Sequence, residues 1–217
     1  MSQHLAFAAA LPFVATYFAA LAIGARAMNR WSAANTKSMP DMKLVSTTPV
    51  IRRLFLAYSA TRPCKIISDR GQPYLERYFV CAMFGLRLYL HRFVGSDPDR
   101  GLHDHPWRWA ISFILLGWYY EATRSGTRKV RWLNVLTGDT FHRVILLPGP
   151  LRGINTPREV WSLFLVPAKD VKEWGFLRDK GRIGQVFTPL NYGSRGKPAQ
   201  WWTQAPKGRD AIGRQKD

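Results

Sequence analysis

The chain has 217 residues and a formal net charge of +18, because 32 Lys and Arg stand against only 14 Asp and Glu. This length fits one mid-sized domain with extra segments and excludes a long multidomain protein. Hydrophobic residues make up 47% of the chain, which excludes a wholly disordered protein. The positive charge indicates anionic surroundings, and lipid headgroups, nucleic acid and acidic proteins all fit that description. Two cysteines, Cys64 and Cys81, are too few for a disulfide scaffold.

An uncharged apolar segment near the start of the chain, Leu5 to Ile23, has the length of a membrane-spanning helix. Basic residues follow it from Arg26 onward, which predicts a single-pass membrane protein with the remaining chain on the cytoplasmic, or equivalent inner, side. A cleaved signal peptide is the main alternative, because Ala25-Arg26-Ala27 has an A-x-A form, although no basic region precedes the apolar run. A buried soluble helix and a mitochondrial presequence are further alternatives. We therefore predict residues 1–27 to be a transmembrane anchor or a signal.

The rest of the chain divides into three predicted parts. Residues 28–71 resemble a basic linker with one short helix over Val50 to Tyr58. Residues 72–192 consist of short aromatic and β-branched runs separated by turn signals, which is typical of an antiparallel sandwich or barrel. Residues 193–217 carry Gly, Pro, Gln and basic residues around Trp201-Trp202, which favours an extended basic tail that holds a partner.

Four of the five histidines lie in the strand-rich part of the chain. Within His103-Asp104-His105, the two imidazoles point to one face if the segment is extended, because side chains two apart share a face of a strand. His142, on a later predicted strand, can complete a face of three nitrogens that suits a metal ion. The alternative is that the pair serves as surface or hydrogen-bonding residues.

The segment from Gly101 to Glu121 resembles the first motif of the cupin superfamily, in which H-x-H is followed by a Glu and then by a Gly that ends the next strand. Gly117 stands twelve residues after the second His, as in that motif, but Ala110 occupies the place of the usual Glu ligand. The segment from Gly138 to Val144 is similar to the second motif and contains the third His, although it is shorter and lacks the expected Asn. Small uncharacterised cupin-like proteins with an H-D-H-P-W core are also similar, and the resemblance covers roughly residues 72–192.

This resemblance implies a mainly β fold, a cupin-type antiparallel β-barrel (double-stranded β-helix or jelly roll), preceded here by the predicted transmembrane helix. By similarity to the three-histidine site of the thiol dioxygenases, His103, His105 and His142 would hold a divalent transition metal. Fe(II) is favoured, and Zn, Mn, Ni or Cu would accept the same ligands. Arg143 is the candidate to bind a substrate carboxylate.

Three further residues near this motif are expected to have roles other than metal binding. Glu121 is considered as a fourth ligand, but we expect it to be a surface partner of an Arg. His91 is expected to have a structural role in preference to a ligand role. Asp104 points away from its two neighbours in a strand, so we expect it to orient a loop.

Two classes of function follow, and the sequence leaves open whether the protein is an enzyme. The first is a membrane-anchored cupin-like protein with a three-histidine metal site, an oxidoreductase of the non-heme oxygenase type acting on a small substrate. The second is a non-catalytic cupin-like subunit of a membrane protein complex, docked through its basic tail or through a cupin dimer. Nucleic-acid binding is not favoured, because the basic residues are spread along the chain and form no recognisable motif.

Overall fold

The computed structural model describes residues 48–146, 159–190 and 200–215, with side chains from residue 50 onward. The chain divides into two compact units, Met1–Pro49 and Val50–Asp217. Only residues 48 and 49 of the first unit are described, and they begin a helix. Every described strand belongs to the second unit.

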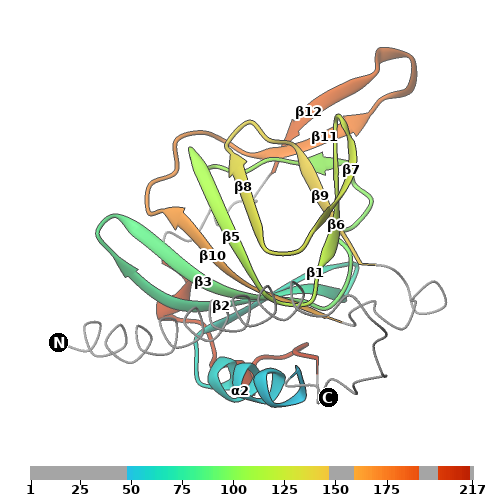
Figure 1. Ribbon diagram of the computed structural model, residues 1–217. Coiled ribbons are helices and arrows are strands. Elements are labelled where there is room, and N and C mark those ends of the chain that lie inside the picture. The colour runs from blue at the N-terminus through green and yellow to red at the C-terminus, as the bar shows by residue number, and fades with distance from the viewer. Residues whose placement is uncertain (1–47, 147–158, 191–199, 216–217) are drawn as a thin grey trace, which may run out of the picture. The chain divides into compact units, whose positions relative to one another are not determined.

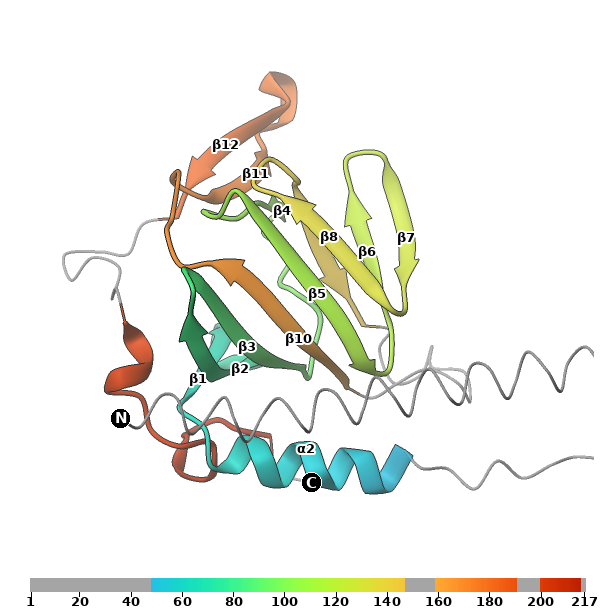
Figure 2. The same ribbon diagram turned by 60° about the vertical axis from the view of Figure 1, so that its left-hand side comes forward.

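Two six-stranded sheets make up most of this unit, and they face each other around a shared interior (Figures 1 and 2). The first sheet has the order β1 (Cys64–Asp69), β2 (Gln72–Met83), β3 (Leu86–Phe93), β10 (Val160–Pro167), β5 (Trp109–Leu116) and β8 (Leu133–Thr137). The second has the order β12 (Gln185–Pro189), β11 (Gly175–Asp179), β4 (Leu102–His103), β9 (His142–Ile145), β6 (Tyr119–Thr123) and β7 (Gly126–Val130). All the strand pairs are antiparallel, and β10 pairs between β3 and β5 although it follows them by many residues. This is the mainly β barrel that the sequence predicts.

Two tight turns set the register of the first three strands. The β1–β2 turn uses Arg70 and Gly71, and the β2–β3 turn uses Phe84 and Gly85; all four residues have positive φ. Positive φ at both central positions is the requirement of the turn whose twist matches a β-hairpin, and Gly meets it without strain at the second position. These hairpins place Tyr89 and the residues that alternate with it on the inner face of β3.

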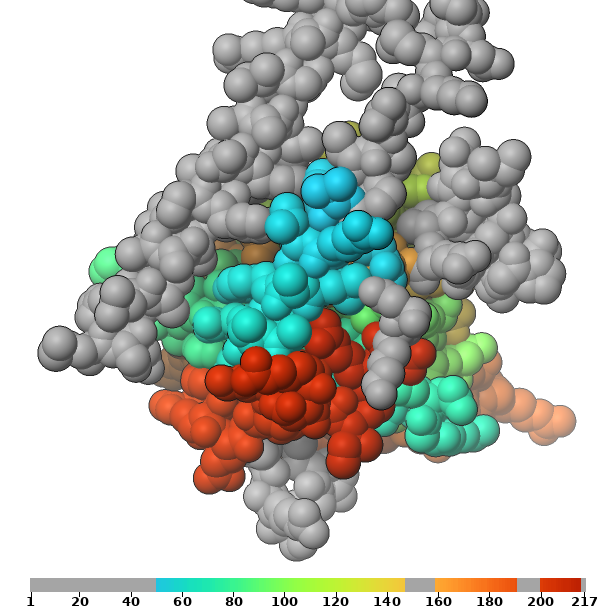
Figure 3. Space-filling view, turned by 90° about the horizontal axis from the view of Figure 1, so that it is seen from below, coloured from blue at the N-terminus to red at the C-terminus, as the bar shows by residue number. Residues whose placement is uncertain are grey.

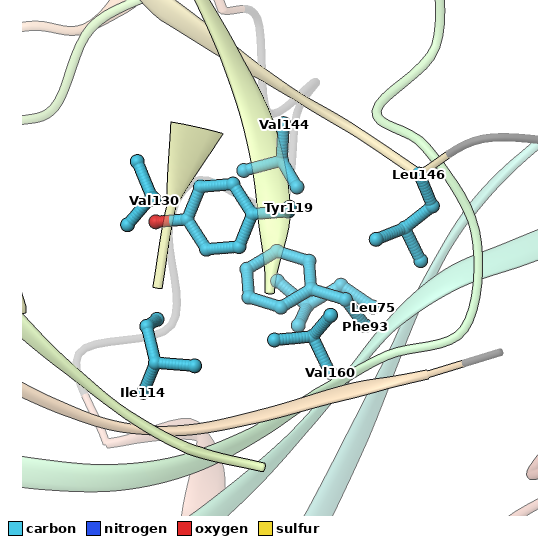
Figure 4. Packing of buried hydrophobic residues seen from close by; sticks show 8 residues of the cluster. All are labelled: Leu75, Phe93, Ile114, Tyr119, Val130, Val144, Leu146 and Val160. Carbon is cyan, nitrogen blue, oxygen red and sulfur yellow. The ribbon is translucent and has the colours of Figure 1, made fainter. Parts of the chain in front are cut away.

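The interior is filled by alternate residues of the facing strands. In β5, for example, Ala110, Ser112 and Ile114 are buried while the residues between them are half-buried. One apolar cluster occupies the end of the barrel near β7 and the start of β10 (Figure 4). Its members are Leu75, Phe93, Ile114, Tyr119, Val130, Val144, Leu146 and Val160. A second cluster lies toward the other end and consists of Phe79, Tyr89, Trp107, Ala110, Leu136, Phe164 and Val166.

Helix α2 (Thr48–Ala60) and the terminal segment, residues 200–215, cover the outside of the first sheet, and they lie side by side in Figure 3. The helix places Phe55 against Trp161 of β10, with ring centroids 5.5 Å apart. The terminal segment contains two short 3₁₀ helices, η4 (Trp201–Thr203) and η5 (Gly208–Asp210), and a third, η2 (Gly181–Ile183), lies between β11 and β12. Arg214 joins the terminal segment to α2 by donating hydrogen bonds to the Leu56 carbonyl (3.1 Å) and to Ser59 Oγ (2.9 Å).

A buried ion network lies under these two segments. Arg92 pairs with Glu76 (3.2 Å) and with Glu159 (2.5 Å), and both carboxylates are almost wholly enclosed. Glu159 also accepts a hydrogen bond from Arg52 of α2 at 2.7 Å, and the backbone nitrogen of Gln215 donates to Glu76 at 2.7 Å. Removing one partner from such a buried set is costly, because the remaining charge is left without compensation. The network therefore fixes α2 and the terminal segment to the barrel.

The structure corrects the part of the fold prediction that concerns a membrane. Within residues 48–146, 159–190 and 200–215, no helix is long and apolar enough to cross a bilayer. The helix α2 has 13 residues, or about 20 Å of length, against about 30 Å of hydrocarbon, and it contains Arg52 and Arg53. The predicted span, Leu5 to Ile23, lies outside the described residues. The described structure thus contradicts the predicted transmembrane helix and single-pass membrane localisation.

The predicted boundaries of the linker and the tail also differ from what is observed. The predicted helix over Val50 to Tyr58 forms, as part of α2, but β1 follows it at Cys64 and pairs with β2 along its whole length, so the barrel begins before residue 72. The described part of the predicted tail, residues 200–215, packs on the barrel. Trp202 stacks on Phe79 with ring centroids 4.4 Å apart, because its large apolar surface is better buried than exposed.

Candidate metal centre

The three histidines singled out in the sequence come together inside the barrel. His103 ends β4, His142 begins β9, and the two residues are direct partners in the antiparallel pair of these strands. His105 follows two residues after His103 and points to the same place. Each of the three offers one nitrogen, and these nitrogens all lie within 4.8 Å of one another.

The spacing of these nitrogens fits a metal ion. The Nε2 atoms of His105 and His142 are 2.9 Å apart. Two nitrogens bound at about 2.1 Å to one metal at right angles would lie about 3.0 Å apart. Neutral imidazole nitrogens are suitable ligands for several first-row divalent metals. The structure thus brings together the three histidine nitrogens that the sequence analysis grouped as one face.

Burial keeps two of the imidazoles neutral. It lowers the pKa of His103 and of His105 well below the ordinary value, and positive neighbours lower both values further. A neutral imidazole retains a lone pair for a metal, whereas a protonated one has none. At neutral pH these two side chains are therefore ready to act as ligands.

A buried carboxylate fixes the third imidazole. Glu121 of β6 has no exposed surface, and its Oε1 lies 2.8 Å from Nδ1 of His142. The same oxygen accepts a hydrogen bond from Asn134 Nδ2 at 2.6 Å, and Oε2 accepts one from Arg128 Nε at 2.8 Å. Burial alone would raise the pKa of Glu121, but hydrogen bonds from His142, Asn134 and Arg128 outweigh it, so the pKa is lowered. An ionised Glu121 can only accept, so Nδ1 of His142 donates to it, and this hydrogen bond orients the ring with Nε2 toward His105.

Asp104 fixes the loop that carries the other two histidines. Its Oδ1 accepts a hydrogen bond from the backbone nitrogen of Gly175 at 2.7 Å, and its Oδ2 accepts one from Lys172 Nζ at 2.7 Å. Gly175 has no room for a side chain, because a Cβ there would meet the backbone of Thr188. Close packing of β11 on β12 thus fixes Gly175, and the two hydrogen bonds hold the carboxylate of Asp104 away from the three histidine nitrogens. This agrees with the orienting role expected of Asp104.

A cavity of about 290 Å³ adjoins the three histidines. Its wall contains aromatic side chains from both sheets and from the terminal segment, among them Phe164, Trp174 and Trp201. Trp107 stacks on His105 with ring centroids 5.6 Å apart, so an apolar wall begins directly beside the nitrogen cluster. The site is a pocket of small-molecule size that is partly shielded from water.

Two other residues considered in the sequence lie outside the nitrogen cluster. Arg143 follows His142 in β9 and so points to the opposite face, where it pairs with Asp99 and lines a separate open hollow. The structure does not bring it into the cavity with the histidines. His91 is buried in the cavity wall, accepts a hydrogen bond from Arg77 Nε at 3.0 Å and stacks on Phe164, which is the structural role expected of it.

Comparison with protein-family models and with curated proteins gives no match for this chain. Solved structures with a similar chain trace include the DMSP lyase DddQ from Ruegeria pomeroyi, with 17% identity and a TM-score of 0.44 over 67% of this chain and 75% of that one. A cupin-2 domain protein from Rhodospirillum rubrum has 14% identity and a TM-score of 0.39, covering 53% and 74%. A structure of Fe(II)-HppE with an alternative substrate has 12% identity and a TM-score of 0.36, covering 49% and 55%.

The observed topology itself agrees with the resemblance found in the sequence. Two opposed antiparallel sheets, with H-x-H at the end of β4 and the third His on its partner strand β9, form the double-sheet architecture of cupins. The described residues therefore have a cupin-like fold.

Sequence reasoning missed the most important support of these three histidines. Glu121 was expected at the surface as the partner of an Arg; it does bind Arg128, but it is wholly buried and also holds His142. The available signal was the alternation in β6, where Tyr119 and Glu121 are two residues apart and share the inner face. Asn134 gives the same kind of signal, because it lies between the outward residues Leu133 and Val135 of β8.

Proposed function

We propose that this cupin is a metal-dependent enzyme in which His103, His105 and His142 bind one divalent metal ion, with Fe(II) favoured, for oxygenase-type chemistry on a small substrate. The observation that carries the proposal is the convergence of three imidazole nitrogens within 4.8 Å, with His142 oriented by a buried carboxylate. Such a carboxylate–histidine pair is the usual support of a metal-binding histidine.

The ligand set favours a metal with open coordination positions. The place of the family's usual glutamate is taken by Ala110, whose side chain is buried in the second apolar cluster and offers no ligand atom. Three neutral nitrogens leave the full positive charge of a divalent ion in place. Bound there, Fe(II) would supply positions for substrate or oxygen and the capacity for electron transfer.

The residues of the chain itself bind, orient and exclude water. Glu121 holds a proton on Nδ1 of His142, and Asp104 holds the loop that positions His103 and His105. The aromatic wall beside His105 keeps water from one side of the cavity. These features support an enzyme with a preformed site.

Nitric oxide tests the open positions, because it binds Fe(II) where oxygen would. The protein is loaded with Fe(II) under anaerobic conditions, the iron content is measured, and nitric oxide is added. We expect the electron paramagnetic resonance signal of an iron–nitrosyl complex in proportion to bound iron. Bound iron without this signal would contradict an oxygenase-type site, and His91→Ala serves as a control that should keep the signal.

A non-catalytic cupin-like subunit remains the second candidate function. The absence of a carboxylate ligand at Ala110 favours it, since a site without its usual ligand can persist as a scaffold. This candidate predicts that the purified protein retains no metal after reconstitution. The same metal analysis therefore distinguishes the two.

A further inference from the structure

The cavity beside the three histidines has a positively charged wall. Among the described residues that line it, the basic side chains outside the histidine cluster are Lys65, Arg77, Arg87 and Arg100. Asp97 is the one carboxylate among them, and its Oδ2 already accepts a hydrogen bond from the Val144 backbone nitrogen at 2.8 Å. A divalent metal on the histidines would add two further charges. The cavity therefore suits an anion better than a neutral or cationic molecule.

Arg100 presents a partly exposed guanidinium at this wall. Within the described residues its Nε has no hydrogen-bond partner although it is shielded from solvent. Its guanidinium lies 5.1 Å from the ring centroid of Phe176, which in turn is 6.1 Å from the His103 ring. The carboxylate of Asp69 forms an ion pair with Nη1 of Arg100 at 3.6 Å, a distance too long for a hydrogen bond. Because Nε is shielded from the cavity as well, a ligand would reach this 35% exposed side chain through its other guanidinium nitrogens.

Trp107, which lies beside His105, has a shielded donor of its own. Trp107 Nε1 is also buried and without a partner among the described residues, and its ring stacks on His105. Indole and guanidinium nitrogens can only donate, so both require an acceptor. A carboxylate has two acceptor oxygens and carries the negative charge that the wall favours.

The remainder of the wall suits an apolar body of limited size. Phe164, Trp174 and Trp201 contribute aromatic surface. The volume of about 290 Å³ corresponds to roughly ten water molecules at ~30 Å³ each. This space admits a small organic molecule but no polymer segment.

We propose that the cavity binds a small organic carboxylate, whose carboxylate group accepts hydrogen bonds from Arg100 and whose apolar body lies against the aromatic wall. The assignment of this ligand as the substrate rests on the proposed function. The binding site itself depends on Arg100 and not on the metal, so the two can be tested separately.

The test compares 3-phenylpropanoate with its uncharged analogue 3-phenylpropanamide, each titrated calorimetrically into metal-free and Zn(II)-loaded protein. In the wild type we expect the acid to bind at least about tenfold more tightly than the amide in both forms, because a charge-assisted hydrogen bond is lost with the amide. Arg100→Met should abolish this difference. Arg100→Lys, which retains the charge but loses the planar guanidinium, should give an intermediate value.

Arg124→Met is the matched control, because Arg124 also lies over a phenylalanine ring, 4.8 Å from Phe141, but is exposed and outside the cavity. It should keep the tenfold preference. Equal binding of acid and amide, binding of neither, or an unchanged preference in folded Arg100→Met or Arg100→Lys protein would overturn the proposal. Metal content is measured on the same samples. A preference for the acid in protein that binds no metal would support this site and contradict the proposed function, whereas bound metal without the preference would do the reverse.

Discussion

Replacing Glu121 tests how the buried carboxylate supports the metal ligands. Its Oε1 accepts hydrogen bonds from His142 Nδ1 and Asn134 Nδ2, and its Oε2 accepts one from Arg128. In Glu121→Gln, the amide oxygen can face His142 and Asn134 while the amide nitrogen faces Arg128, whose side chain is 57% exposed and can turn to water. His142 then keeps a hydrogen bond but loses the charge of its partner. In Glu121→Ala it loses both.

Loss of such a supporting group typically lowers metal affinity by 10- to 100-fold, or about 1.4 to 2.7 kcal/mol. We expect the metal affinity to fall about tenfold in Glu121→Gln and about a hundredfold in Glu121→Ala. The assay is competition for Zn(II) or Co(II) against a chelator of known affinity, with circular dichroism to confirm folding. Glu173→Gln, at an exposed carboxylate, is the control and should bind as the wild type does. Folded Glu121→Ala protein with unchanged metal affinity would refute the reasoning.

Two further predictions concern stability. A Cβ at Gly208 would meet the Ser59 carbonyl and lie 2.8 Å from the Tyr78 ring, so Gly208→Ala should lower the free energy of unfolding by about 1–3 kcal/mol in denaturant titration. In the control Gly95→Ala, the new Cβ would lie 3.5 Å from its nearest neighbour, and the free energy of unfolding should change by less than about 1 kcal/mol. Equal effects of the two substitutions would contradict the packing of the terminal segment. Burial would raise the pKa of Glu159, but hydrogen bonds from Trp161, Arg92 and Arg52 hold it below the ordinary 4.5. Ionised Glu159 therefore stabilises the fold above that pH, and this contribution is lost as pH falls below it, so the thermal midpoint should fall more steeply there in the wild type than in Glu159→Gln. Parallel curves would contradict this assignment.

The strands of the barrel were predictable because their alternation and turn signals are local. The same alternation and the H-x-H spacing predicted that His103 and His105 share a face, and the position of His142 on a later predicted strand, supported by the resemblance to cupins, gave the third histidine. By contrast, the neighbours of Glu121 depend on the register of β6 with β9, which no local pattern states. Arg143 was predicted to bind a substrate because it adjoins His142 in sequence, but adjacent residues of a strand point to opposite faces, so it lies outside the cavity.

The terminal segment could not be predicted for a different reason. Residues 200–215 have no periodic pattern, and short 3₁₀ turns give little local signal. Their order comes from tertiary contacts, in particular the stack of Trp202 on Phe79 and the hydrogen bonds of Arg214 to α2. These contacts join parts of the chain more than a hundred residues apart. Composition alone therefore predicted a tail where the structure has a packed element.

The central claim is that three histidines bind one metal ion, and elemental analysis tests it most directly. Purified wild-type protein is reconstituted with Fe(II) without oxygen and compared with the His103→Ala/His105→Ala double variant and with His91→Ala as the matched buried-histidine control. The account predicts close to one metal ion per chain in the wild type and in His91→Ala, and almost none in the double variant. Equal metal in all three proteins, or none in the wild type, would contradict it.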